Sequence, residues 1–211
     1  MIQKPRDYDT AQSYDSDFSR LPAGGYVVDI KRMEEATAST GKQMVIVSFD
    51  IAEGEYKDYF ARQYKNDKSR EITSGRTAKW RGVYYTFPLT SEGLTNPSFK
   101  GIMTCIENSN YGFHVQWPLN FDLFKGKKLG LLFRDEEYVA NDGTVKVSVK
   151  PCSARSVDCI QSGEFNTPSR KKLENVPANA SAPSACGALG QSVYSTQEFV
   201  PTTVEDDELP F

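Results

Sequence analysis

The segment between residues 127 and 150 constrains the fold of this chain most tightly, because it predicts an antiparallel β-hairpin. A β-prone run, KKLGLLFR (127–134), continues through Tyr138 and is followed by Asn141-Asp142-Gly143. An Asp-Gly step between two such runs is a strong hairpin-turn signal. The return run VKVSVK (145–150) alternates valines with Lys146, Ser148 and Lys150, so one face of the hairpin is predicted to be apolar and the other basic. We expect the return strand to continue from Cys152 towards Ile160.

A second hairpin is predicted near the N-terminus. The turn-forming segment LPAGG (21–25) leads into YVVDIKRM (26–33), and TASTGK (37–42) returns the chain to MVIVSFDI (44–51). β-Branched residues dominate the last run, as is typical of a central strand.

The next segment predicts a third, interrupted strand. We place strands near 55–65 and 79–87, with a polar loop over 66–78. Strand alternation puts Tyr56, Phe60, Arg62 and Tyr64 on one face. Phe60 suggests that this face meets the core, which makes Lys57, Tyr59 and Lys65 the better surface candidates.

One helix is predicted after these strands. Asn96 is a favourable N-cap and Pro97 suits the first helical position. Apolar side chains then recur at the spacing of one helix face, at Phe99, Ile102, Met103 and Ile106.

The order of these elements predicts a mainly β fold, a five-stranded OB-fold barrel with one α-helix between strands 3 and 4. We place it at residues 21–165, after a flexible arm at 1–20. From Asn166 the sequence is rich in Pro, Ala, Ser, Thr and Asn, which predicts a flexible linker over 166–203.

Positive charge and aromatic rings concentrate between residues 54 and 87. Eight basic residues face three acidic ones from Lys57 to Arg81. Cations that contact phosphates, interleaved with rings on which bases stack, are typical of sequence-tolerant binding to single-stranded nucleic acid. Together with the basic hairpin face, they give our candidate DNA-binding residues: Lys57, Tyr59, Arg62, Lys65, Arg76, Lys79, Trp80, Arg81, Tyr84, Arg134, Lys146 and Lys150.

The alternative is that alternate rings face a β core and the charges form an ordinary solvated face. Trp80 in particular could either stack on a base or belong to the core. The formal net charge of −3 does not argue against DNA, because residues 1–165 are balanced and the excess lies in residues 166–211.

The chain resembles phage- and prophage-encoded single-stranded DNA-binding proteins. The resemblance covers about residues 20–168 and rests on LPAGGY (21–26), FDIAEGEY (49–56), FKGI (99–102) with ENSN (107–110), and RSV (155–157) with SGEF (162–165). It implies a role in replication or recombination of phage DNA, without a cofactor. The loop 66–78 and the tail linker have no counterpart in that family.

The last eight residues, VEDDELPF (204–211), are similar to the acidic tip of bacterial single-stranded DNA-binding proteins. A terminal Phe beside carboxylates is a compact ligand for a pocket with basic and apolar walls. We therefore expect a tip that binds replication, recombination or repair proteins. Its candidate residues are Asp206, Asp207, Glu208, Leu209, Pro210 and Phe211. A tail that only keeps the protein soluble is the alternative.

Other features argue against catalysis and secretion. His114 is the only histidine, and the four cysteines form no C-x-x-C pair, so we expect neither a metal site nor an enzyme. Without a signal peptide or long apolar run, we expect a cytoplasmic protein, with no membrane partner, in a bacterial host. It could form a homodimer or higher oligomer.

The leading hypothesis is thus a non-enzymatic protein that coats single-stranded DNA and recruits enzymes through its tip. A single-strand annealing or recombination-mediator protein is the alternative, and a nucleic-acid-processing enzyme is a third candidate.

Overall fold

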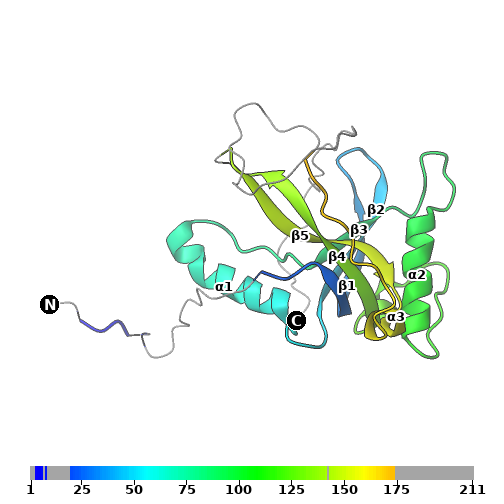
Figure 1. Ribbon diagram of the computed structural model, residues 1–211, viewed down its shortest axis with the longest axis horizontal. Helices are drawn as coiled ribbons and strands as arrows, with labels where there is room; N and C mark the ends of the chain where they lie inside the picture. The colour runs from blue at the N-terminus through cyan, green and yellow to red at the C-terminus, as the bar shows by residue number, and fades with distance from the viewer. Residues whose placement is uncertain (1–2, 7, 9–19, 142, 174–211) are drawn as a thin grey trace.

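The protein folds around one curved antiparallel β-sheet, in a computed structural model that describes residues 3–6, 8, 20–141 and 143–173 (Figure 1). The sheet order is β3-β2-β1-β4-β5. The strands are β1 (Gly24–Thr37), β2 (Gln43–Ile51), β3 (Val83–Thr86), β4 (Lys128–Val139) and β5 (Val145–Arg155). The helices are α1 (Tyr59–Ser74), α2 (Pro97–Ser109), the short 3₁₀ helix η1 (Phe121–Phe124) and α3 (Val157–Gln161). The tip, the linker from residue 174 and most of the predicted arm lie outside the described residues.

Both predicted hairpins are confirmed, but the return strand of the second one ends at Arg155 and does not continue towards Ile160, which lies in α3. β1 pairs with β2 from Val28 to Thr37, and β4 pairs with β5 through to Val139 opposite Val145. β1 is long because its first half pairs with β4 while its second half pairs with β2. A register shift after Ile30 adds a bulge, and bulges bend a strand and increase its twist.

The five strands of the predicted barrel are present as one antiparallel sheet, but this sheet is open and does not close into a barrel. Its two edge strands, β3 and β5, approach each other without forming a ladder in the described residues. β3 has only four residues, which is too short to extend along β5.

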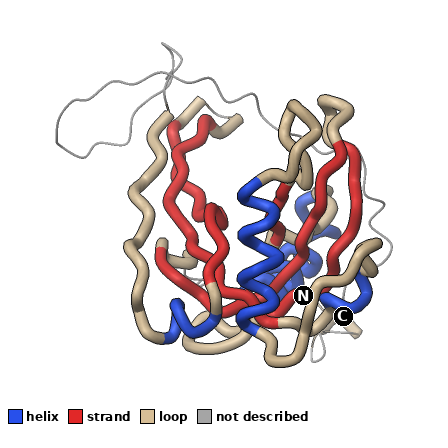
Figure 2. The backbone as a smooth tube through the Cα atoms, turned by 90° about the vertical axis from the view of Figure 1, so that its right-hand side faces the viewer, coloured by secondary structure: helices blue, strands red, loops and turns tan. Residues whose placement is uncertain are grey.

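The predicted helix at 96–106 is confirmed as α2. The Asn96 side chain accepts a hydrogen bond from Ser98 N at 2.9 Å, and Pro97 is the first helical residue. Phe99, Ile102, Met103 and Ile106 are buried in the main core. Figure 2 shows this helix in front, with strands of the curved sheet on either side of it.

The prediction of a strand at 55–65 and a loop at 66–78 is wrong, because the chain forms α1 from Tyr59 to Ser74. Asp58 turns the chain before the helix by adopting a left-handed conformation, with φ of 56°. Phe60 and Tyr64 also stand four residues apart, which is helical spacing as well as strand alternation. The positions of these rings therefore fit both a helix and a strand. Only their contacts with the sheet show that the segment is a helix.

The prediction of a single helix is wrong as well, because α3 follows β5 directly. Gly25 and Gly130 allow α3 and the residues after it to approach the sheet. A Cβ on Gly25 would lie 2.5 Å from the Phe165 ring, and one on Gly130 would lie 2.6 Å from Ile160.

The ordered contacts extend beyond residue 165, where we placed the end of the globular part. Lys171 N donates to Asp135 O at 2.8 Å, and Glu137 N donates to Lys171 O at 3.0 Å. Arg170 forms an ion pair with Glu137 at 3.0 Å. Residues 170–173 therefore lie beside β4, beyond the part of it that pairs with β1.

Candidate nucleic-acid interface

The first turn of α1 is held against the sheet by aromatic rings. Six rings form a closed circuit of edge-to-face contacts, with centroids 5.2–6.3 Å apart. Edge-to-face pairs add to the stability that burial provides. The members are Tyr26, Tyr56, Tyr59, Phe60, Phe49 and Phe133.

This circuit corrects the placement of Tyr59 on the surface. Tyr59 is only 7% exposed, and its hydroxyl accepts a hydrogen bond from Leu21 N at 3.2 Å. The placement of Phe60 in the core is confirmed by its exposure of 8%. Tyr59 is thus positioned to stabilise the fold and has little surface to offer a base.

The N-terminus of α1 is also anchored by a buried carboxylate from β2. Asp50 is 1% exposed and accepts backbone hydrogen bonds from Phe60 and Ala61, both at 2.9 Å. It accepts a third from Ile51 at 2.8 Å. Burial raises the pKa of Asp50, against these hydrogen bonds and the charge of Lys31, which lower it.

Residues after α1 return to the sheet through a close contact at Gly82. Phe49 N donates to Gly82 O at 2.8 Å, and the Trp80 indole N–H donates to the same oxygen at 3.1 Å. The Trp80 ring is half-buried, packs against the core and lies 6.2 Å from the Tyr64 ring. The structure therefore gives Trp80 a packing role, and leaves part of its ring accessible.

Six of the predicted DNA-binding cations lie on or near α1, and all six are exposed. Arg81 forms an ion pair with Asp67 at 2.7 Å, which ties the returning segment to the helix. The set comprises Lys57, Arg62, Lys65, Arg76, Lys79 and Arg81.

A second group of predicted residues lies on β4, β5 and β3. Arg134 and Lys150 are opposite each other in the β4–β5 ladder, and both pair with Glu136, at 2.8 Å and 3.7 Å. Two cations thus share one carboxylate on this hairpin. Tyr84 lies on β3, the opposite edge strand of the sheet, and is partly buried against the main core. Burial raises the pKa of Tyr84, Cys152 raises it further and the Arg134 charge lowers it.

Lys146 lies further along the same hairpin, opposite Tyr138 in the ladder. Tyr138 is 42% exposed, so an aromatic ring and an exposed lysine stand together near the hairpin end. The prediction of a basic face on this hairpin is confirmed for Lys146 and Lys150.

The structure therefore brings Arg134 and Lys150 together at Glu136, and Lys146 lies on the same strand as Lys150. The other six cations lie on α1 or in the segments that flank it. In Figure 1, α1 and the β4–β5 hairpin both extend away from the end of the molecule that α2 covers.

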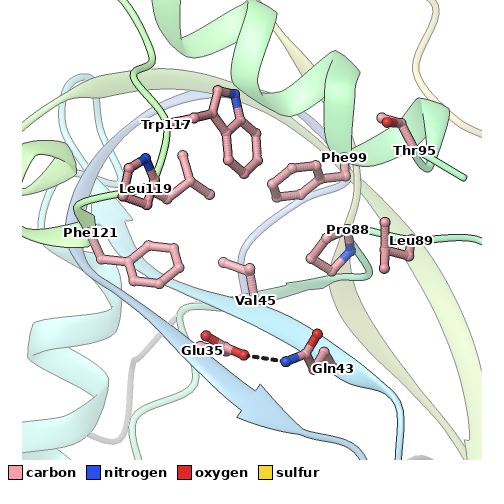
Figure 3. A pocket seen from close by; sticks show the side chains of 11 residues that line it. Glu35, Gln43, Val45, Pro88, Leu89, Thr95, Phe99, Trp117, Leu119 and Phe121 are labelled. Atoms are coloured by element: carbon pink, nitrogen blue, oxygen red, sulfur yellow. Dashed lines mark hydrogen bonds between the residues drawn. The ribbon is translucent and has the colours of Figure 1, made fainter. Parts of the chain in front are cut away.

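Sequence reasoning chose Tyr84 as a DNA-binding residue and left out the neighbouring Tyr85. Tyr84 is partly buried, whereas Tyr85 is 38% exposed on the opposite face of β3, and burial raises the pKa of Tyr85. Trp117 was not among the candidate residues either. It is 70% exposed in the connection before η1 and lines a pocket beside α2 (Figure 3).

The described residues contain neither a cluster of metal ligands nor a membrane-spanning helix. No group of three or more His, Cys, Asp or Glu side chains is placed there to hold a metal ion. No described helix has the length and apolar character needed to cross a bilayer.

Comparison with protein families matches part of the chain. The model of a family described as "Protein of unknown function (DUF669)" matches residues 6–76. That range includes β1, β2 and α1, and ends before β3 and the β4–β5 hairpin. No curated protein matches the chain.

Proposed function

We propose that the protein is a non-enzymatic single-stranded DNA-binding protein of phage replication or recombination, built on an OB fold. The observation that carries the proposal is the pair of cations on the β4–β5 hairpin, Arg134 and Lys150, which lie opposite each other and share Glu136. These cations can contact phosphates, and the exposed Tyr138 ring on the same hairpin can stack on a base, which are the two interactions that a single strand needs.

The strand order supports the OB assignment. A Greek-key barrel of this class contains five strands, and nucleic acid binds across strands 2 and 3 between the β1–β2 and β4–β5 loops. Here β1 pairs with both β2 and β4, β2 with β3, and β4 with β5. Joining β3 to β5 would close the sheet, and these two strands already approach each other.

The α1 cations extend the proposed interface. Arg62 and Lys65 are exposed, and neither forms an ion pair with another described residue. Because phosphate contacts are independent of sequence, such side chains add affinity and salt dependence without base preference.

Glu136 sets the charge balance at the site. It is shared between Arg134 and Lys150, so a phosphate that approaches meets one uncompensated positive charge. A phosphate could replace the weaker 3.7 Å contact of Lys150 while Glu136 keeps Arg134 in place.

The second part of the proposal concerns the C-terminal tip, which lies outside the described residues. We propose that VEDDELPF (204–211) recruits replication, recombination or repair proteins of the bacterial host. Substituting Phe211 by Ala keeps every acidic side chain and removes the apolar anchor. Partner capture from host lysate should then fall while DNA affinity stays unchanged, and retention of the same partners would contradict the recruiting role.

The experiment that tests the main proposal is a gel shift with single-stranded DNA, duplex DNA and RNA of equal length. The proposal expects preferential binding to a single strand. Complementary strands with and without Mg²⁺ extend the test, because strand pairing would indicate an annealing protein and strand cleavage would indicate an enzyme.

A further inference from the structure

A pocket of about 440 Å³ lies beside the N-terminal end of α2, and neither Tyr84 nor Arg134 lines it. Pockets for small ligands usually span roughly 300–1,000 Å³. Its walls come from the β1–β2 hairpin, the segment after β3, α2 and the connection to η1. Figure 3 shows the rings of Trp117, Phe99 and Phe121 directed towards the same space, with Val45 below them.

One side of this pocket is polar. Gln43 Nε2 donates a hydrogen bond of 2.8 Å to Glu35 Oε1. That bond uses one amide hydrogen and one carboxylate oxygen, so the pair still offers Glu35 Oε2, Gln43 Oε1 and the second amide hydrogen. In Figure 3 this pair lies on one side of the pocket and Trp117 on the other.

The shape and chemistry of the pocket match a flat ring with hydrogen-bonding groups along one edge. We propose that it receives one unstacked nucleobase of the bound strand, preferentially a base with an exocyclic amino group such as cytosine. The amino group donates to Glu35, Gln43 completes contact with the same edge, and the base ring packs against Trp117. This inference rests on the proposed function, which it deepens by assigning a base site.

The charges around the pocket favour a nucleic acid over an acidic or apolar peptide. Lys42 and Lys100 adjoin the lining residues Gln43 and Phe99 in sequence, and both lysines are exposed. They can contact the phosphates on either side of the bound base. An apolar side chain would make no use of the polar groups that Glu35 and Gln43 offer, and an acidic peptide would be repelled by Glu35.

The base identity follows from the donors and acceptors. A carboxylate accepts from the amino group of cytosine, whereas the corresponding edge of thymine carries an acceptor oxygen that Glu35 would repel. Replacing Glu35 by Gln supplies a donor at that position, so this variant should lose much of the preference for cytosine.

The test is fluorescence-anisotropy binding of oligo(dC) and oligo(dT) of equal length to the full chain. We expect wild type to bind oligo(dC) more tightly. Trp117→Ala should weaken oligo(dC) binding about 5- to 150-fold, the range expected when one stacked base is lost. Leu123→Ala is the matched control, because Leu123 is an exposed apolar residue, 50% accessible, that does not line the pocket. It should change the affinity less than about twofold.

Glu35→Gln provides a second readout that does not depend on removing a large ring. It should bring the affinities for oligo(dC) and oligo(dT) together while the thermal melting temperature stays the same. If Trp117→Ala and Glu35→Gln both keep the wild-type affinities, the pocket does not hold a base and serves another occupant, such as a protein segment. If wild type binds neither oligonucleotide, the proposed function fails and this inference fails with it.

Discussion

The Asp50 carboxylate accepts a hydrogen bond from the backbone N–H of Phe60 at 2.9 Å, so a strand residue caps the first turn of α1. Ala61 N donates to the second carboxylate oxygen at the same distance. The local N-cap residue, Asp58, makes no such side-chain bond. The attachment of α1 to the sheet therefore depends on a tertiary contact, and so does the position of the α1 cations.

Replacing Asp50 by Ala should destabilise the protein by about 1–3 kcal/mol, because buried backbone donors at the start of α1 lose their acceptor. Thermal or denaturant unfolding measures this change. Glu55→Ala is the control, since Glu55 is exposed in the same connection, and it should stay within about 0.5 kcal/mol of wild type. Equal stability of the two variants would contradict the capping role of Asp50.

The stabilisation by Asp50 should also depend on pH. Burial raises its pKa in the folded state above the ordinary value of 3.8, so the folded protein binds this proton more tightly than the unfolded chain does. The contribution is then fully present below pH 3.8 and decreases as pH rises through the folded-state pKa. The stability difference between wild type and Asp50→Ala should therefore shrink over that window. A difference that grows with pH would show that the hydrogen bonds dominate and lower the pKa.

Gly82 should tolerate no side chain. A Cβ there would lie 2.2 Å from the backbone oxygen of Phe49 and 2.9 Å from the Phe60 ring. We expect Gly82→Ala to lower stability by about 1–3 kcal/mol through forced displacement of the chain.

Gly101 offers a matched control for that substitution, because it lies within α2 and a Cβ would meet nothing within 4 Å. Gly101→Ala should raise the melting temperature, since Ala favours a helix over Gly by roughly 0.5–1 kcal/mol. Similar effects of the two substitutions would contradict the close contact at Gly82.

Tyr59→Phe separates a core role from a DNA-binding role. It removes the acceptor for Leu21 N and should cost about 1–2 kcal/mol of stability, because that buried donor is left unpaired. The affinity for single-stranded DNA should remain the same, as measured by anisotropy on the folded variant. If Tyr59→Phe binds single-stranded DNA more weakly while its stability is unchanged, Tyr59 contacts DNA and the core role is contradicted.

The elements with a strong local signal could be predicted from the sequence. Asn96 and Pro97 before a helical apolar stripe identified α2, and the turn at 141–143 identified the β4–β5 hairpin. Each of these depends on residues that are adjacent or one helical turn apart.

The start of α1 could not be predicted, because its cap comes from Asp50, several residues earlier on another element. Tyr59 and Phe60 also face a core made by distant strands. The contacts between elements in the candidate site could not be predicted either. The basic residues of the hairpin were found by alternation, whereas the sharing of Glu136 by Arg134 and Lys150 depends on how β4 and β5 pair.

The most direct test of the central claim is the salt dependence of single-stranded DNA affinity, measured on wild type and on Arg134→Ala/Lys150→Ala. If four to six phosphates are contacted, the slope of log affinity against log salt should be roughly −3 to −4. The double variant should reduce its magnitude by about 0.7, the contribution of one contact on a single strand, because the group loses the one positive charge that Glu136 does not compensate. Lys125→Ala, a change at an exposed lysine next to η1, should leave the slope unchanged. A slope near zero, or equal affinity for duplex DNA, would contradict the account.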